Sequence, residues 1–256
     1  MAEHDPDRVG GLAWTRRTRG KLSPSERRRL LGAIVLAQGN YLVGRLKFAT
    51  GRTPVGASHL SAAALTPPDS AFARAAEEAA LEQPPSVVGH GYRTWMFGSA
   101  LATLDRAALD PELFYVASLL HDHGIAEPVR GEDFTLRSAD RLEQCGRGVN
   151  AAEADIRSAA DAVTVHTTPG ISIERDGALG VYVQTGAMFD LAGLRGADLS
   201  WDYRGAVIRR HPRDGVTDAI VPMIKAEARA NPDGRFGLLH RCGFTVLVKQ
   251  NPLRPR

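Results

Sequence analysis

Apolar positions recur every three or four residues through most of the chain, whereas strict alternation of apolar and polar residues is scarce. In residues 113–120 (LFYVASLL) the apolar side chains fall at i, i+3, i+4 and i+7, which is the spacing of a buried helix. Further helices are predicted at about residues 137–146, 151–165, 179–194 and 214–230. Residues 245–248 (TVLV) are the one short stretch whose composition favours a strand.

Capping sequences mark where several of the predicted helices begin. Residues 23–26 (SPSE) combine a Ser at the N-cap, a Pro at the first helical position and a Glu that closes a capping box. They predict a helix that runs to about residue 47. Residues 66–69 (TPPD) have a similar arrangement and predict a helix to about residue 83.

Two more helices, at about 86–104 and 111–120, are predicted from the capping residues Ser86 and Asp110. Residues 50–58 are rich in Gly, Thr, Pro and Ser and are predicted to be a loop. Residues 1–22 are polar and basic, and we expect them to be frayed.

The pattern predicts an all-α protein. We expect a helical bundle over residues 59–256 and a basic N-terminal extension, residues 1–58, that contains one long helix. In helical bundles, metal sites are built from side chains on facing helices.

The positive charge is confined to the N-terminal part of the chain. Residues 1–52 hold eleven Lys and Arg against four Asp and Glu, whereas the whole chain has a formal charge of only +3. No aromatic residues interleave with the arginines to form a stacking platform, so nucleic acid is not an expected partner. No apolar run reaches the roughly 18 residues that a membrane span needs, and only two cysteines, Cys145 and Cys242, are present. We expect a cytoplasmic protein that does not bind membranes. Whether it forms a homo-oligomer is left open.

Four residues stand out as candidate metal ligands. His121 and Asp122 end the apolar helix 111–120, and His90 lies between two glycines on the preceding helix. Asp190 lies in an otherwise apolar helix, where a carboxylate needs a partner. An arginine such as Arg195 would satisfy Asp190 equally well, and His90 taken alone is typical of a core histidine.

Together these residues resemble the HD superfamily of metal-dependent hydrolases, whose pattern is H…HD…D. Residues 119–124 (LLHDHG) match the central signature, and residues 89–93 (GHGYR) match the helix of the first histidine. Residues 165–170 (VHTTPG) and 184–193 (QTGAMFDLAG) are similar to the cyanamide hydratase-like branch. The resemblance covers about residues 84–230. The lysine that follows HD in the cyclic-dinucleotide phosphodiesterases is replaced by Ile125.

The resemblance implies one divalent metal ion held by His90, His121, Asp122 and Asp190. Imidazole and carboxylate ligands suit Zn, Fe or Mn, and the ligand types do not distinguish among these metals. Between HD and the final Asp, dinuclear members carry closely spaced histidines, whereas here only His166 lies in that interval, which favours one metal.

Two histidines are candidates for moving protons: His166, which we favour, and His123. Arg93 and Thr167 are candidate substrate-binding residues, and residues 167–177 have the composition of a mobile lid.

We therefore expect a metal-dependent hydrolase or hydratase that acts on a small molecule, with hydration of cyanamide or a nitrile as the reaction that the resemblance implies. Two alternatives stay open. The first is a phosphohydrolase that acts on nucleotides or other phosphomonoesters. The second is an HD domain that binds a metal and a ligand without catalysis.

Overall fold

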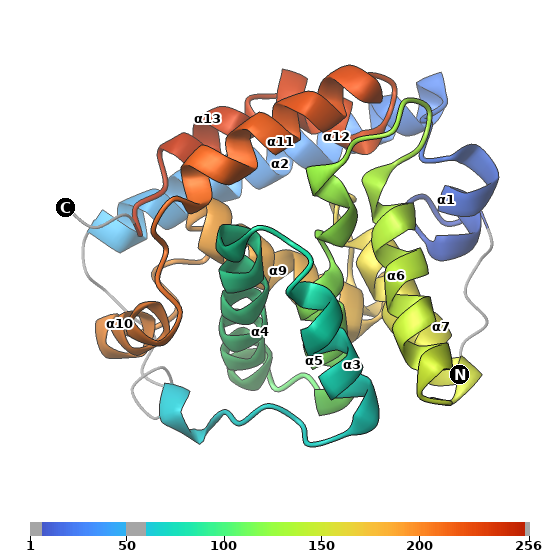
Figure 1. The fold of residues 1–256 in the computed structure, drawn as a ribbon. Coiled ribbons are helices and arrows are strands. Elements are labelled where there is room, and N and C mark those ends of the chain that lie inside the picture. The colour runs from blue at the N-terminus through green and yellow to red at the C-terminus, as the bar shows by residue number, and fades with distance from the viewer. Residues whose placement is uncertain (1–6, 50–59, 254–256) are drawn as a thin grey trace.

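The computed structural model describes residues 7–49 and 60–253, and within these residues the chain forms helices and no strands. The all-α prediction is confirmed (Figure 1). The helices are α1 (Leu12–Thr18), α2 (Pro24–Ala49), α3 (Ala71–Ala80), α4 (Pro85–Asp105), α5 (Pro111–Leu120), α6 (Phe134–Gly148), α7 (Glu153–Val165), α8 (Ile173–Asp176), α9 (Ala178–Ala192), α10 (Trp201–Arg210), α11 (Val216–Ala230), α12 (Arg235–Arg241) and α13 (Phe244–Lys249), with short 3-10 turns η2 (Ala62–Ala64) and η3 (His123–Ala126). The loop predicted at 50–58 and the boundary at 58/59 lie outside the described residues.

Capping residues predicted from the sequence begin two of the helices. At α2, the Ser23 hydroxyl accepts from the Glu26 N–H at 3.3 Å, and the Glu26 carboxylate accepts from the Ser23 N–H at 2.7 Å. At α5, the Asp110 carboxylate accepts from the Leu113 N–H at 2.9 Å. The predicted start at 66–69 is wrong, because Ser70 caps α3 and the helix begins at Ala71.

The core of the bundle is α4, α5, α7 and α9, flanked by α3 and α6. A second group, α11, α12 and α13 together with α2, covers one end of it (Figure 1). Two glycines let α4 approach its neighbours closely. A methyl group at Gly186 on α9 would lie 2.2 Å from the Thr94 carbonyl oxygen, and one at Gly91 would lie 3.1 Å from the Ser118 carbonyl oxygen of α5. This close packing brings the faces that carry His90, His121 and Asp190 together.

Helix α2 has one buried and one exposed apolar face. Leu30, Ile34 and Tyr41 are buried, whereas Val35 and Leu42 on the outer side are exposed. Leu30 and Ile34 pack in a cluster with Leu238 of α12. Among the described residues, no helix combines the length and the apolar character that crossing a membrane requires.

The described part of residues 1–22 is folded and not frayed. Trp14 on α1 is 1% exposed, and α1 packs against α7. The buried guanidinium of Arg8 pairs with Asp161 and, at 2.9 Å, with Asp176. The prediction of a frayed segment is wrong because Arg8 pairs with acidic residues more than 150 positions away in the sequence.

The strand predicted at 245–248 is also wrong, because these residues belong to helix α13. Phe244 and Val248 are buried, whereas Val246 is 52% exposed. A strand would have placed all three side chains on one face, so the four-residue spacing of the buried pair is helical.

Candidate metal centre

Three potential ligand atoms meet where α4 passes the end of α5. His90 lies on α4, His121 is the C-cap of α5, and Asp122 follows it. The two imidazole Nε2 atoms are 3.3 Å apart, and Asp122 Oδ2 lies 3.6 Å from that of His90 and 3.4 Å from that of His121. All three residues are buried, and they form a group that could hold a metal ion. The prediction is confirmed to this extent.

Hydrogen bonds to the far side of each ring orient the two histidines. His90 Nδ1 lies 2.8 Å from Asp190 Oδ2, and His121 Nδ1 lies 2.8 Å from the Ser118 carbonyl oxygen. Both partners are acceptors, so each Nδ1 carries the proton that it donates. Each Nε2 then presents its lone pair to the centre, which is the tautomer that a metal ligand requires.

The separations fit a divalent metal ion. Zn²⁺ binds imidazole nitrogen and carboxylate oxygen at about 2.0–2.2 Å, so tetrahedral ligand atoms around it lie about 3.4 Å apart. The three measured separations are 3.3, 3.4 and 3.6 Å. Three protein ligands with room for a fourth are the arrangement of catalytic zinc sites rather than of structural ones.

The structure does not bring Asp190, the fourth predicted ligand, into this group. Asp190 lies behind the His90 ring, where its carboxylate accepts from His90 Nδ1, from Arg93 Nε at 2.9 Å and from Arg213 Nε at 2.8 Å. The sequence allows an arginine such as Arg195 as the partner of this carboxylate, but the structure places Arg93 and Arg213 there. Arg195 pairs instead with Asp105 and Asp198. Asp190 therefore holds the His90 ring in position.

The pKa values of Asp122 and Asp190 are both lowered, but by different groups. Burial alone would raise the pKa of Asp122, but the His121, His166 and His90 imidazoles hold that pKa well below its ordinary value. Burial would likewise raise the pKa of Asp190, and the Arg93 and Arg213 guanidinium groups hold it well below the ordinary value. Among the described residues, Asp122 is thus a buried anion whose close partners are imidazoles, and these must be neutral to bind a metal.

His166, the C-cap of α7, lies next to the ligand group. Its Nε2 is 3.6 Å from the other oxygen of Asp122, Oδ1, and its ring meets that of His121 edge-on at 4.9 Å. Nδ1 is bonded to the Val163 carbonyl oxygen, so Nε2 is unprotonated in the neutral ring. Burial lowers the pKa of His166, which favours this neutral form.

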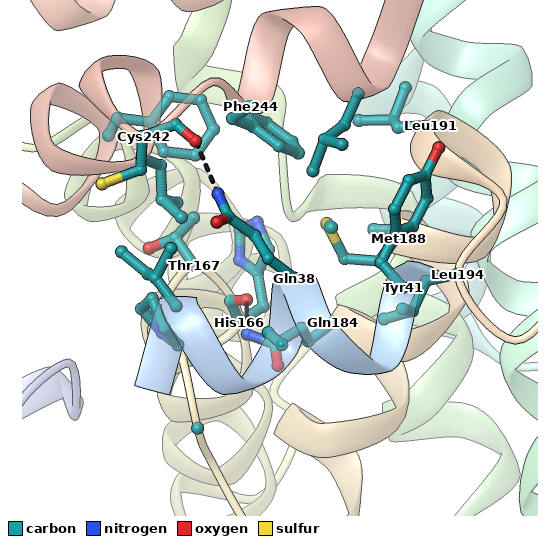
Figure 2. Close-up of a pocket in the computed structure, with 18 of the residues that line it drawn as sticks. Gln38, Tyr41, His166, Thr167, Gln184, Met188, Leu191, Leu194, Cys242 and Phe244 are labelled. Atoms are coloured by element: carbon teal, nitrogen blue, oxygen red, sulfur yellow. Dashed lines mark hydrogen bonds between the residues drawn. The ribbon is translucent and has the colours of Figure 1, made fainter. Parts of the chain in front are cut away.

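A cavity of about 140 Å³ opens onto His121, Asp122 and His166. Figure 2 shows that its walls come from elements far apart in the sequence, including Tyr41 of α2, Met188 and Leu191 of α9 and Phe244 of α13. His90 does not line the cavity and lies beneath the two other ligand residues. The metal group therefore has one accessible side, and His166 is part of the wall on that side.

Residues 167–177, predicted as a lid, have two different parts. Thr167, Pro169 and Gly170 line the cavity, and the Thr167 hydroxyl is buried without a hydrogen-bond partner among the described residues. Residues 173–176 form the short helix α8, which Arg8 anchors through the buried Asp176. Thr167 is thus placed at the site, as the sequence prediction required.

Two predicted site residues do not reach the cavity. The Arg93 guanidinium is fully buried behind the site, where it binds Asp190 and donates to the Pro212 carbonyl oxygen at 2.7 Å, so a substrate-binding role does not fit its position. His123 Nε2 lies 3.0 Å from Glu82 Oε2, and His123 is not among the residues that line the cavity. A role for His123 in proton transfer does not fit its position either.

The sequence reasoning missed Gln184 and Arg213. The Gln184 amide donates to the His166 carbonyl oxygen at 2.6 Å and to the Thr168 carbonyl oxygen at 2.8 Å, and the side chain lines the cavity. It therefore fixes the backbone on both sides of Thr167. Gln184 lies six residues before Asp190 in the matched segment 184–193, so its polar side chain in an apolar helix was a usable signal. Nothing in the sequence indicated that Arg213 pairs with Asp190.

Comparison with known proteins adds no assignment. No protein-family model matches the chain, and a search of curated proteins finds no match.

Proposed function

We propose that this protein is a metal-dependent hydrolase or hydratase that adds water to a small uncharged substrate. One observation carries the proposal: three buried ligand atoms lie 3.3–3.6 Å apart, and a cavity opens onto two of the residues that carry them, His121 and Asp122. An unprotonated imidazole nitrogen of His166 lies beside them. A structural metal site has no need of such an opening.

The order of the site residues along the chain supports the proposal. His90, His121-Asp122 and Asp190 follow one another as in the HD superfamily, and the segments that contain His166 and Asp190 resemble its cyanamide hydratase-like branch. A divalent ion held by His90, His121 and Asp122 would lower the pKa of a water molecule from about 15.7 towards about 7.

His166 is the residue proposed to move the proton. Its Nε2 faces the cavity end of the site and can accept a proton from the attacking water. In the hydration of a nitrile, the water oxygen bonds to the nitrile carbon, and one C–N π bond breaks. His166 returns the proton to the nitrogen, and after tautomerisation the product is the amide, which contains all the atoms of the nitrile and the water.

The phosphohydrolase alternative has less support from the cavity. Phosphoryl transfer requires cations around the phosphate oxygens. Neither lysine nor arginine lines the cavity among the described residues, and Arg93, the candidate for this role, is bound to Asp190. The lack of lysine and arginine among the described lining residues thus favours an uncharged substrate over a phosphate.

The test is an assay of metal-loaded protein with cyanamide, nitriles and nucleotides. We expect urea from cyanamide or amides from nitriles, and no phosphate release. His166→Asn should retain the metal and lower kcat by about 10²–10⁴-fold, the range typical of a lost general acid–base group. Phosphate release would favour the phosphohydrolase instead. Bound metal without turnover of any of these substrates would favour the non-catalytic metal- and ligand-binding domain.

A further inference from the structure

The cavity above the candidate metal centre is apolar along most of its length. Beyond His121, Asp122 and His166, its walls are chiefly aliphatic and aromatic side chains from four helices. They include Ile34, Tyr41, Met188, Leu191, Phe244 and Leu247. Figure 2 shows Tyr41 of α2 beside Met188 and Leu194, with Leu191 and Phe244 also around the pocket.

Polar groups gather at one end of this cavity. Thr167 and Gln184 adjoin His166, and the Gln184 amide nitrogen is already bonded to two carbonyl oxygens. The Gln38 amide nitrogen, on the α2 side, is bonded to the Cys242 carbonyl oxygen at 2.7 Å (Figure 2). Asp122 is the one carboxylate among the lining residues, and it belongs to the metal group. A charged substrate would lose its hydration here without gaining a partner of opposite sign away from the metal.

The size of the cavity limits the apolar group that it can take. Its volume is about 140 Å³. An engineered cavity of about 150 Å³ in another protein, lined by Leu, Ile and Phe, stays dry and binds benzene. A group of about six carbons is therefore the largest that this cavity can hold without rearrangement.

We infer that the natural substrate is an uncharged molecule with an apolar group of up to about six carbons, which lies between α2, α9 and α13 while the reacting polar group meets the metal. This inference rests on the proposed function for the identity of the reacting group. The claim that the substrate carries an apolar group depends only on the residues that line the cavity. It makes α2, which lies outside the segment that resembles the HD superfamily, part of the substrate site.

The first experiment measures binding along a series of straight-chain nitriles from propanenitrile to octanenitrile, by NMR titration of the full-length protein with and without Zn²⁺. Each added methylene group should tighten binding by about fourfold, up to about six carbons, and the gain should then stop. The dependence on chain length should be the same with and without the metal, since the apolar walls lie away from the ligand atoms. Phenyl phosphate should bind more weakly than benzonitrile.

Matched variants of α2 test the position of the apolar group. Ala37 lines the cavity but is exposed, so Ala37→Phe can fill the cavity without disturbing the core. Val35 is 68% exposed and does not line the cavity, so Val35→Phe is the control of equal bulk on the same helix. Ala37→Phe should abolish the dependence on chain length, and Val35→Phe should leave it unchanged. A second pair enlarges the cavity: Leu247→Ala should extend the optimum by one or two carbons, whereas Val246→Ala should not.

The outcomes separate this inference from the proposed function. Turnover of cyanamide with no effect of chain length on nitrile binding would overturn the inference and leave the hydratase function standing. Binding that depends on chain length without turnover of any nitrile would support the inference and count against the hydratase function. Tighter binding of phenyl phosphate than of benzonitrile would overturn the inference that the substrate is uncharged.

Discussion

Asp122 and Asp190 are both buried carboxylates next to the His90 ring, and they are neutralised in different ways. Asp190 is fully buried and bonded to two arginines and to His90 Nδ1, and its backbone carbonyl accepts further bonds from Arg213 and Asn251. Asp122 has three imidazoles around it and no arginine or lysine among its partners on the described residues.

The difference between the two regions assigns their roles. Around Asp190, two guanidinium groups and the His90 Nδ1–H bond to one carboxylate, so this carboxylate needs no further cation. Around Asp122 three Nε2 atoms face one carboxylate, and the hydrogen bonds of the rings keep those atoms unprotonated when the rings are neutral. That set lacks a cation, and a divalent metal ion supplies one. We propose that the first region positions His90 and that the second region holds the metal ion.

The largest effect is expected from Asp122→Ala. Removing the one anionic ligand should reduce the metal content of the purified protein from about one equivalent to near zero, while the helical circular dichroism spectrum is preserved. Elemental analysis of the variant beside the unaltered protein checks this. Full metal occupancy in Asp122→Ala would break the comparison, because the two carboxylates would then not differ in metal binding.

Asp190→Ala should act mainly on stability. It leaves Arg93 and Arg213 buried without their carboxylate, and breaking a buried ion pair in this way costs about 3–5 kcal/mol. Loss of the partner of His90 should also weaken metal binding roughly 10–100-fold. Urea denaturation and zinc titration measure the two effects. Asp69→Ala, which removes an exposed ion pair with Arg74, is the control and should change the free energy of unfolding little.

Glu227 is another buried carboxylate, and its ion pair with Arg137, at 3.9 Å, is longer than the pairs that Asp190 makes. Burial raises its pKa from an ordinary 4.5 to about 7, and the nearby Asp133 carboxylate adds to the rise. Between these pH values the folded protein binds more protons than the unfolded chain, so stability falls as pH increases through about 7. This contribution is about 3 kcal/mol at most.

Glu227→Gln removes the titrating group while its amide oxygen can still accept from Phe134 N and Asn231 Nδ2. We expect the variant to lose less stability than the unaltered protein between pH 5 and 8. Urea unfolding at several pH values measures this. Parallel stability curves for the two proteins would mean that Glu227 is ionised throughout, as Asp190 is.

The smallest effect is expected from His123→Asn. His123 bears on the comparison because it follows Asp122 directly but faces Glu82. The variant should keep its metal and change kcat by less than about twofold, in contrast to His166→Asn. A loss of activity in His123→Asn equal to that in His166→Asn would place His123 in the site.

The sequence predicted the helices and helix starts that depend on local residue spacing. The helical period of residues 113–120 and the capping residues Ser23 and Asp110 predicted α5 and the starts of α2 and α5. The resemblance to the H…HD…D pattern, rather than local spacing, grouped His90 with His121 and Asp122, and the structure brings these three residues together. Thr167 was also placed at the cavity.

Tertiary contacts decided what the sequence could not predict. The sequence predicts that Asp190 is a buried carboxylate in need of a partner, but its arginine partners come from α4 and from a segment 23 residues later. The apolar wall that α2 adds to the cavity depends on packing between segments about 150 residues apart. The short helix α13 contains β-branched residues, which favour a strand when taken alone. Its packing against α9 and α11 decides which of its side chains are buried.

The central claim is that Asp122 and its neighbouring histidines bind one divalent metal ion. Elemental analysis of the purified, unaltered protein after incubation with Zn²⁺ and removal of the excess tests it most directly, combined with X-ray absorption at the zinc edge. We predict one zinc per chain with a first coordination shell of nitrogen and oxygen, two of the ligands being imidazole. No retained zinc, or zinc with a sulfur ligand from Cys145 or Cys242, would contradict it.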